Sequence, residues 1–75
     1  MTQSIGQYRV GINFNPSGDD TVGTIKSKAA ELIDLVQTMP TIDSGEAHRL
    51  RALAATAFEE GAMWAVKAAT KTLNE

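Results

Sequence analysis

The sequence contains no cysteine, a single histidine and only two prolines among its 75 residues. The lack of cysteine excludes disulfide bonds and thiolate metal sites. One histidine without a second imidazole also argues against a structural zinc site. Domains this small usually depend on disulfides, a metal or partner subunits for their stability. Association with further copies of the chain is therefore the expected source of stability.

Long apolar runs and an excess of basic residues are also missing. No segment approaches the ~20 apolar residues of a membrane span, and residues 1–11 lack the apolar core of a signal peptide. We therefore expect a cytoplasmic protein that does not bind membranes. The 7 basic and 9 acidic residues give a formal net charge of −2, which argues against a protein that coats nucleic-acid polymers. A small anionic ligand in a local basic pocket remains compatible with this charge.

Helix-forming residues dominate the second half of the chain. Residues 49–73 are rich in alanine, leucine, glutamate and lysine, with no proline and one glycine, a composition that favours a helix. We predict a helix over 46–73. Small residues recur every four positions and form a stripe that another backbone could approach closely; they are Ala57, Gly61, Ala65 and Ala69.

A second, amphipathic helix is predicted over 19–39. Its apolar residues alternate at spacings of three and four, which places them on one helix face; they are Val22, Ile25, Ala29, Leu32, Val36 and Met39. Asp19 or Asp20 is expected to cap the start, and Pro40 to end the helix. The loop over 40–45 is short enough to reverse the chain, with Asp43 or Ser44 as the next cap.

The N-terminal residues predict an arm and a turn over 1–18. Tyr8, Val10, Ile12 and Phe14 alternate with polar residues or glycine, the period of an extended segment, and NFNPSG at 13–18 predicts a tight turn. The expected fold is all-α: one domain over 1–75, an antiparallel helical hairpin with an extended N-terminal arm. Because each helix has only one partner in the chain, several copies are expected to form a homo-oligomeric helical bundle.

No residue pattern indicates catalysis, a metal site or a cofactor. His48 lies near the start of the second predicted helix among charged residues, and no spacing there indicates a triad, so a solvated surface histidine is the simpler interpretation. Glu59 and Glu60 are adjacent and point about 100° apart on a helix. Other carboxylates lack the loop spacing of a calcium site; they are Asp19, Asp20 and Asp34. We predict that the protein is not an enzyme.

Two clusters are compatible with anion binding. Arg9, Lys26 and Lys28 flank the 13–18 turn, beside Tyr8 and Phe14, which could stack on a purine. A solvated helix face is the competing interpretation for the two lysines, and packing of the arm is the competing one for the aromatics. Near the chain end, basic residues and a threonine share one helix face, where the simpler explanation is that cations complement the helix dipole; they are Lys67, Thr70 and Lys71.

Two sequence blocks show a more specific likeness. GINFNPSG followed by VGTIKSKAAELIDLV, together with LAATAFEEGAMWAVKAATK, resembles the hairpin domain of phage sponge proteins that antagonise CBASS and Thoeris immunity. The resemblance covers the chain from Tyr8 to Lys71. It implies an all-helical homo-oligomer, with a hexamer favoured, in the cytoplasm of the host cell. It also implies immune evasion by binding cyclic dinucleotides, cyclic trinucleotides or cyclic ADP-ribose isomers without cleaving them.

The resemblance also implies site residues. For a cyclic dinucleotide pocket between subunits, the matching aromatic is Tyr8 or Phe14, and the matching phosphate and base contacts are two of the three residues Thr24, Lys26 and Lys28. A second pocket, for cyclic trinucleotides, would use Lys67 and Thr70. One alternative is a helical assembly module that binds no small ligand. Another is a nucleotide hydrolase that uses Glu59 or Asp34 with a divalent ion.

Overall fold

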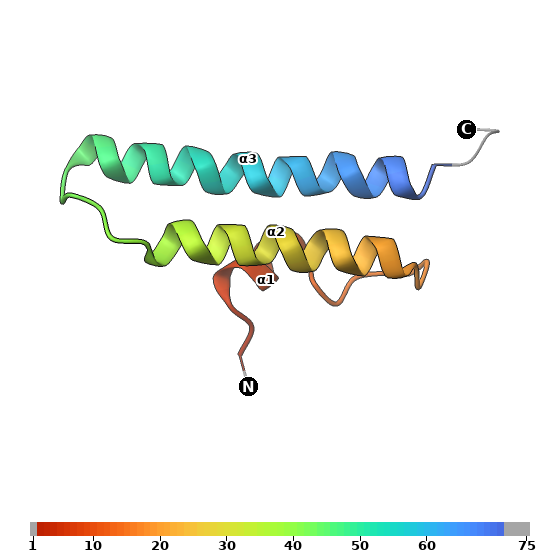
Figure 1. Ribbon diagram of the computed structural model, residues 1–75. Coiled ribbons are helices and arrows are strands. Elements are labelled where there is room, and N and C mark those ends of the chain that lie inside the picture. Colours follow the sequence, from red (N-terminus) through yellow and green to blue (C-terminus); the bar gives the residue numbers. More distant parts are fainter. Residues whose placement is uncertain (1, 72–75) are drawn as a thin grey trace.

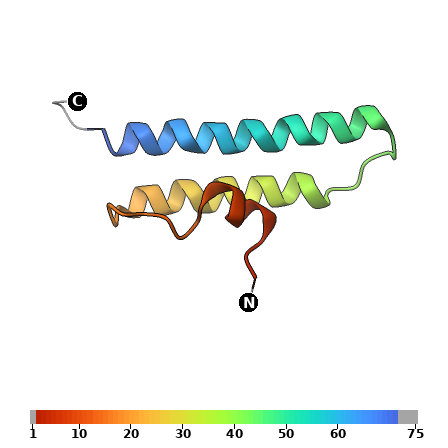
Figure 2. The same cartoon turned by 180° about the vertical axis from the view of Figure 1, so that it is seen from behind.

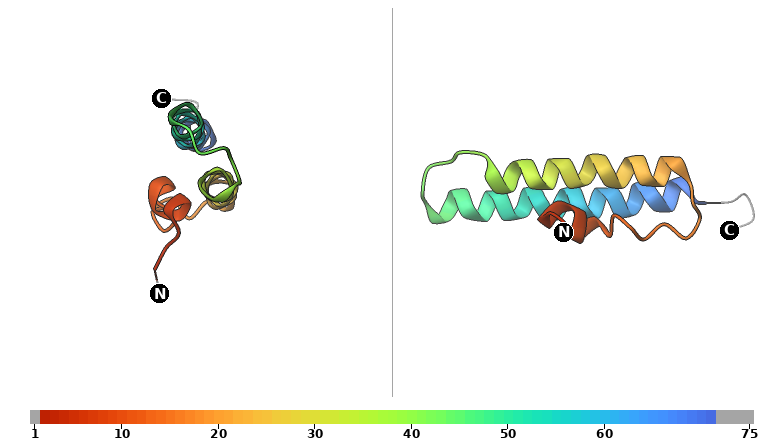
Figure 3. Two further views of the ribbon diagram at one scale, coloured as in Figure 1. Left: turned by 90° about the vertical axis from the view of Figure 1, so that its left-hand side faces the viewer. Right: turned by 90° about the horizontal axis from the view of Figure 1, so that it is seen from below.

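The computed structural model describes residues 2–71, which form three helices: α1 (Ile5–Val10), α2 (Asp20–Thr38) and α3 (Gly45–Ala69). α2 and α3 run antiparallel, side by side (Figure 1). α1 packs mainly on α2 and also reaches α3 (Figures 2 and 3). The Cα positions extend over 48 × 30 × 12 Å. The predicted all-helical hairpin is confirmed, since the described residues contain no strand.

The ends of α2 are set by side-chain and proline chemistry. The Asp19 carboxylate accepts a hydrogen bond from the Thr21 amide at 2.7 Å and caps the helix start. Met39, just before Pro40, has extended backbone angles with ψ 144°, as expected of a residue whose helical angles the proline ring disfavours. The helix therefore covers 20–38, one residue less at each end than the predicted 19–39.

α3 begins one residue earlier than predicted and ends sooner. The Ser44 hydroxyl accepts a hydrogen bond from the Ala47 amide at 3.0 Å, so Ser44, not Asp43, caps the start. At the other end, Thr70 leaves helical geometry and Lys71 lies beyond the helix. The prediction of helix at 70 and 71 is therefore wrong, and positions 72 and 73 lie outside the described residues.

The predicted extended arm is wrong for residues 5–10, which form α1. Ser4 and Gln7 make a reciprocal capping box, and Gly11 ends the helix in the left-handed region at φ 64°. Asp34 of α2 accepts a hydrogen bond from the Gly6 amide at 2.7 Å. A six-residue helix is too short to be stable alone. The caps and the contact with α2 therefore outweigh the two-residue alternation, which the sequence shares with extended segments.

Gly6 sets how closely α1 approaches α2. Gly6 is buried, and a Cβ atom at this position would collide with the backbone carbonyl of Ala30. The close contact of two backbones brings α1 within reach of α3 as well. Arg9 and Val10, at the end of α1, are thereby carried to the side of the hairpin where both long helices are accessible.

The core lies between α2 and α3 and is made of small and medium side chains. Ile33 is fully buried at 0% exposure and packs with Val36 and Ala55, while Val10 and Phe58 pack against this cluster. The buried residues of α3 are Ala55 and Ala62. Large apolar side chains elsewhere on the helix stay exposed: Leu50, Leu53, Met63 and Trp64. The predicted stripe positions Ala57, Gly61 and Ala69 are exposed too.

Candidate functional site

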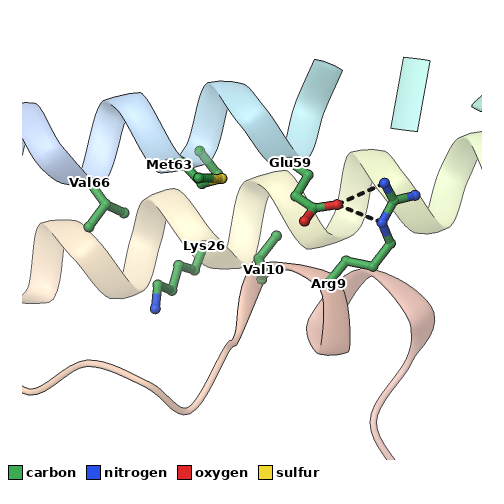
Figure 4. A pocket seen from close by; sticks show the side chains of 7 residues that line it. Arg9, Val10, Lys26, Glu59, Met63 and Val66 are labelled. Atoms are coloured by element: carbon green, nitrogen blue, oxygen red, sulfur yellow. Dashed lines mark hydrogen bonds and ion pairs between the residues drawn. The ribbon is translucent and has the colours of Figure 1, made fainter. Parts of the chain in front are cut away.

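A cavity of about 240 Å³ lies where the three helices meet. Its walls combine an ion pair with apolar side chains (Figure 4). The lining residues are Arg9 and Val10 of α1, Lys26 of α2, and Glu59, Ala62, Met63 and Val66 of α3. All three helices therefore contribute to it, and the cavity depends on the docking of α1.

An ion pair between α1 and α3 forms one end of this cavity. Arg9 Nε and Nη2 lie 2.8 and 2.7 Å from the same oxygen, Oε1 of Glu59, and Nη2 also donates to the Thr56 hydroxyl at 3.3 Å. The two side chains are 25% and 34% exposed. A pair so accessible to solvent contributes up to about 1 kcal/mol to stability. The guanidinium that we expected to meet a phosphate is thus directed at Glu59.

Lys26 lies deep between α2 and the residues that follow α1. Its side chain is buried, with 8% of the residue exposed. The ammonium donates to the carbonyl oxygen of Gly11 at 3.0 Å and to that of Phe14, and lies 5.4 Å from the Phe14 ring centre. A buried charge needs such partners, because its desolvation is otherwise costly. Lys26 therefore holds the 11–14 segment against the hairpin.

A second cavity, of about 250 Å³, adjoins the first beside the 13–18 turn. Lys26 and Val66 line both cavities. The other lining residues of the second cavity are Phe14, Asn15, Pro16, Ser17, Val22 and Thr70. Phe14, Lys26 and Thr70, predicted as site residues from distant parts of the sequence, are thus brought together here.

Hydrogen bonds within the turn keep this wall ordered. The Asn15 amide donates to the Asp19 carbonyl at 3.0 Å, and the Ser17 hydroxyl donates to the Asn15 side-chain oxygen at 2.9 Å. Gly18 adopts a left-handed φ of 66°, a conformation that side chains with a Cβ disfavour. The tight turn predicted from NFNPSG is therefore present.

Thr24 and Lys28 do not reach these cavities. Residues two apart on a helix point about 200° apart, so both face away from Lys26. The Thr24 hydroxyl is exposed and donates to the Asp20 carbonyl at 3.0 Å. Lys28 lines a shallow groove on the outer face of α2, together with Glu31, Leu32 and Leu35. One chain therefore presents the predicted contacts on two separate faces.

The two candidate aromatics differ in position. Tyr8 and Phe14 are both accessible, at 76% and 72% exposure. Phe14 lines the second cavity beside Lys26, whereas Tyr8 is not among the residues that line either cavity. Only Phe14 is therefore placed to cover a base held beside Lys26 in the same chain.

The two residues of the predicted second pocket lie in different surroundings. Thr70 lines the second cavity, and its hydroxyl donates to the Val66 carbonyl at 2.9 Å. The Lys67 ammonium lies 5.7 Å from the ring centre of the exposed Trp64. The structure therefore associates Thr70 with Lys26 and Phe14, and associates Lys67 with Trp64.

Glu59, Met63 and Val66 line the first cavity but are not among the binding residues predicted from the sequence. The sequence suggests Glu59 only as the carboxylate of the hydrolase alternative. A signal was present, because the buried residues Ala55 and Ala62 of α3 are seven positions apart and define its inner face. Glu59 and Val66 lie four positions after each of them, on the same side of the helix.

The titratable groups outside the cavities have ordinary surface partners. His48 Nε2 lies 3.1 Å from Asp43 Oδ1, with both side chains exposed. Arg49 hydrogen-bonds Glu46 near the start of α3 and lowers the pKa of that carboxyl. Among residues 2–71, no three histidine or carboxylate side chains gather as a metal site would require. Asp34, the other carboxylate of the hydrolase alternative, holds the Gly6 amide.

The fold and the paired cavities define a class of protein: a small helical hairpin with a docked N-terminal helix and two adjoining cavities along one side. The chain belongs to the Acb2/Tad1 hairpin domain family, whose model matches residues 6–70. This is the anti-CBASS and anti-Thoeris sponge family, whose members bind cyclic nucleotides and are not enzymes. Searches of curated proteins and of solved structures found no match. None of the described helices combines the length and apolarity needed to cross a membrane.

Proposed function

We propose that this chain is a non-enzymatic sponge that sequesters cyclic nucleotide immune signals in the host cytoplasm and so blocks antiphage defence. Its ligands are cyclic dinucleotides, cyclic trinucleotides or cyclic ADP-ribose isomers. The family match supports the class of ligand. The structural observation that carries the proposal is the position of Lys26 between two adjoining cavities.

This arrangement suits the chemistry of a cyclic nucleotide, in which phosphates alternate with flat bases. An ammonium group has three N–H donors, and two of those of Lys26 are directed at the carbonyls of Gly11 and Phe14. The third is available to a phosphate oxygen. A phosphate beside Lys26 would place the neighbouring bases in the cavities on either side, with the Phe14 ring accessible for stacking on one of them.

The outward position of Thr24 and Lys28 supports a site shared between copies of the chain. In the proposed assembly, the outer face of α2 of one copy meets the cavities of another and adds Thr24 and Lys28 to the ligand contacts. Assembly also covers the exposed apolar side chains of α3, among them Leu50, Leu53 and Trp64. We propose a homohexamer, in keeping with the family resemblance. Lys67 remains the candidate for a separate trinucleotide pocket.

The proposal is tested by a thermal-shift screen against cyclic dinucleotides, cyclic trinucleotides and cyclic ADP-ribose isomers. A ligand at 100 times its dissociation constant stabilises the folded state by about 2.7 kcal/mol. Each kcal/mol raises the melting temperature of a domain this size by roughly 4–8 °C. The expected result is a ligand-specific rise, with intact ligand recovered by chromatography after denaturation.

Other outcomes would contradict the proposal. Recovery of a cleaved ligand would indicate an enzyme. No shift with any member of the panel, together with a stable oligomer in analytical ultracentrifugation, would support the helical assembly module, for which the exposed apolar side chains of α3 would be the reason.

A further inference from the structure

The Glu59 carboxylate lines the first cavity, close to the position beside Lys26 where the proposed function places a phosphate. A carboxylate beside a phosphate is unfavourable, because the two negative charges repel each other. Glu59 is nevertheless held in place by two contacts from Arg9, both to the single oxygen Oε1. The neighbouring Glu60 is exposed, so helix packing alone does not require a carboxylate to face the cavity.

The second oxygen of Glu59 is available for a ligand. Within residues 2–71, no hydrogen bond or ion pair is found for Oε2. Figure 4 shows this oxygen turned away from Arg9, towards the side of the cavity where Val10 and Lys26 lie. An ionised carboxylate is a hydrogen-bond acceptor only. The cavity therefore presents a fixed acceptor to whatever enters it.

The other walls favour a flat apolar body. Ala62, Met63 and Val66 line the side formed by α3, and Val10 lines the side formed by α1. A methionine thioether adapts to aromatic surfaces and contacts them favourably. Pockets of this kind, mostly apolar with one or two directional polar groups, are typical of sites that orient a base-sized ligand.

We propose that Glu59 determines base specificity and that the cavity beside it takes a guanine base. This inference rests on the proposed function and names the base within it. The N1–H and N2–H groups of guanine are adjacent donors on one edge, and a carboxylate oxygen accepts from such an edge. Adenine presents the unprotonated N1 at the equivalent position, so that an acceptor would face an acceptor. Glu59 thus selects a guanine-containing cyclic nucleotide over one that contains only adenine.

Arg9 is then a positioning residue. It neutralises the charge of Glu59 and fixes the carboxylate through Oε1 while it leaves Oε2 directed at the base. This assignment replaces the expectation that Arg9 binds a phosphate. It also explains why α1 must be docked for the site to exist, since Arg9 lies on α1 and Glu59 on α3.

The test compares binding of cyclic diguanylate, cyclic guanylate–adenylate and cyclic diadenylate by isothermal titration calorimetry. The proteins are the wild type, Glu59→Gln and Glu60→Gln. Glu60→Gln makes the same charge change at an exposed neighbour and serves as the matched control. In Glu59→Gln, Arg9 has donors only, so the amide oxygen stays on Arg9 and the NH₂ group faces the cavity. An acceptor is thereby replaced by a donor.

We expect the wild type and Glu60→Gln to prefer the guanine-containing ligands. In Glu59→Gln the ratio of guanine to adenine affinities should fall by about tenfold or more, the effect of losing a charge-assisted hydrogen bond. An unchanged ratio in Glu59→Gln, or a wild-type preference for cyclic diadenylate, would overturn the role of Glu59 while leaving the sponge function intact. A wild type that binds no cyclic nucleotide would overturn the sponge function itself, and the inference with it.

Discussion

The N-terminal segment and the hairpin are held in place by different kinds of contact. α2 and α3 pack through apolar side chains such as Ile33 and Ala55. Residues 5–18 are attached mainly by polar contacts that involve Asp34, Lys26 and Glu59. Apolar packing depends on volume and tolerates similar shapes, whereas each polar contact depends on particular atoms. The difference indicates that the hairpin carries the stability and that the N-terminal segment completes the candidate site.

The largest loss of stability should come from a change in the apolar core between α2 and α3. Ile33 is fully buried, and an isoleucine-to-alanine change at such a position costs about 2–5 kcal/mol because it leaves a cavity. We expect Ile33→Ala to lower the free energy of unfolding by that amount in urea denaturation. The control is Ile42→Ala, at an exposed position, which should change stability by less than about 0.5 kcal/mol. Equal effects of the two changes would contradict the assignment of the core.

The next largest effect should come from a change that loosens the N-terminal segment while the hairpin stays folded. In Gly6→Ala the added Cβ collides with the Ala30 carbonyl, and such overpacking costs about 1–3 kcal/mol. Because α1 can move away, we expect the cost to appear as faster hydrogen exchange in residues 5–14, with α2 and α3 still protected. Gly45→Ala has no atom within 4 Å of the new Cβ and is the control. Global unfolding in Gly6→Ala would show that the two regions are not separable.

A change at Lys26 should affect both the segment and the ligand. Lys26→Met keeps the apolar stem but removes the ammonium that holds the carbonyls of Gly11 and Phe14. Hydrogen bonds of a charged group contribute roughly 1.5–3 kcal/mol each. We therefore expect at least about tenfold weaker cyclic nucleotide binding and faster exchange in residues 11–14, with the oligomer intact.

Lys28→Met is the matched control for the change in hydrogen exchange, because Lys28 lies on the outer face of α2. It should leave exchange in residues 11–14 unchanged. If both substitutions weaken binding but only Lys26→Met speeds exchange, Lys28 affects the ligand without holding the 11–14 segment, as expected of a contact from another copy. Normal exchange in Lys26→Met would contradict the structural role of Lys26.

The last comparison distinguishes the two candidate aromatics. Stacking on a base contributes about 1–3 kcal/mol, so Phe14→Ala should weaken binding by roughly 5–150-fold. Tyr8→Ala should have little effect, since Tyr8 lines neither cavity. Titration calorimetry of both variants with one ligand gives the comparison. A larger loss in Tyr8→Ala would move the stacking position to α1.

The long helices could be predicted from the sequence, whereas the docked segment could not. Val22, Ala29 and Val36 repeat at helical spacing and are all buried, because local periodicity reflects the face that packs. Leu32, predicted on the same face, is exposed. α1 has only six residues and depends on Asp34, 28 positions away from Gly6. No local sequence pattern contains such a contact. The alternation that begins at Tyr8 therefore predicted an extended segment where the structure has a helix.

Only part of the candidate site could be predicted from the sequence. Lys26 and Phe14 follow from a short stretch of chain and lie together, as the sequence suggested. Their association with Thr70 depends on how α3 packs against α2, and the pairing of Arg9 with Glu59 depends on the docking of α1. That docking requires the buried glycine at position 6, whose role is not visible without the neighbouring backbone.

The thickness of the molecule has a consequence for how its affinity should be measured. The Cα positions extend only 12 Å along the shortest axis. A chain this thin covers part of a bound cyclic nucleotide and leaves another side exposed. In the proposed assembly the other side is covered by a second copy, so ligand binding and subunit association are linked equilibria. The apparent dissociation constant will therefore rise when the protein is diluted. Ligand binding measured over a series of protein dilutions thus detects subunit association.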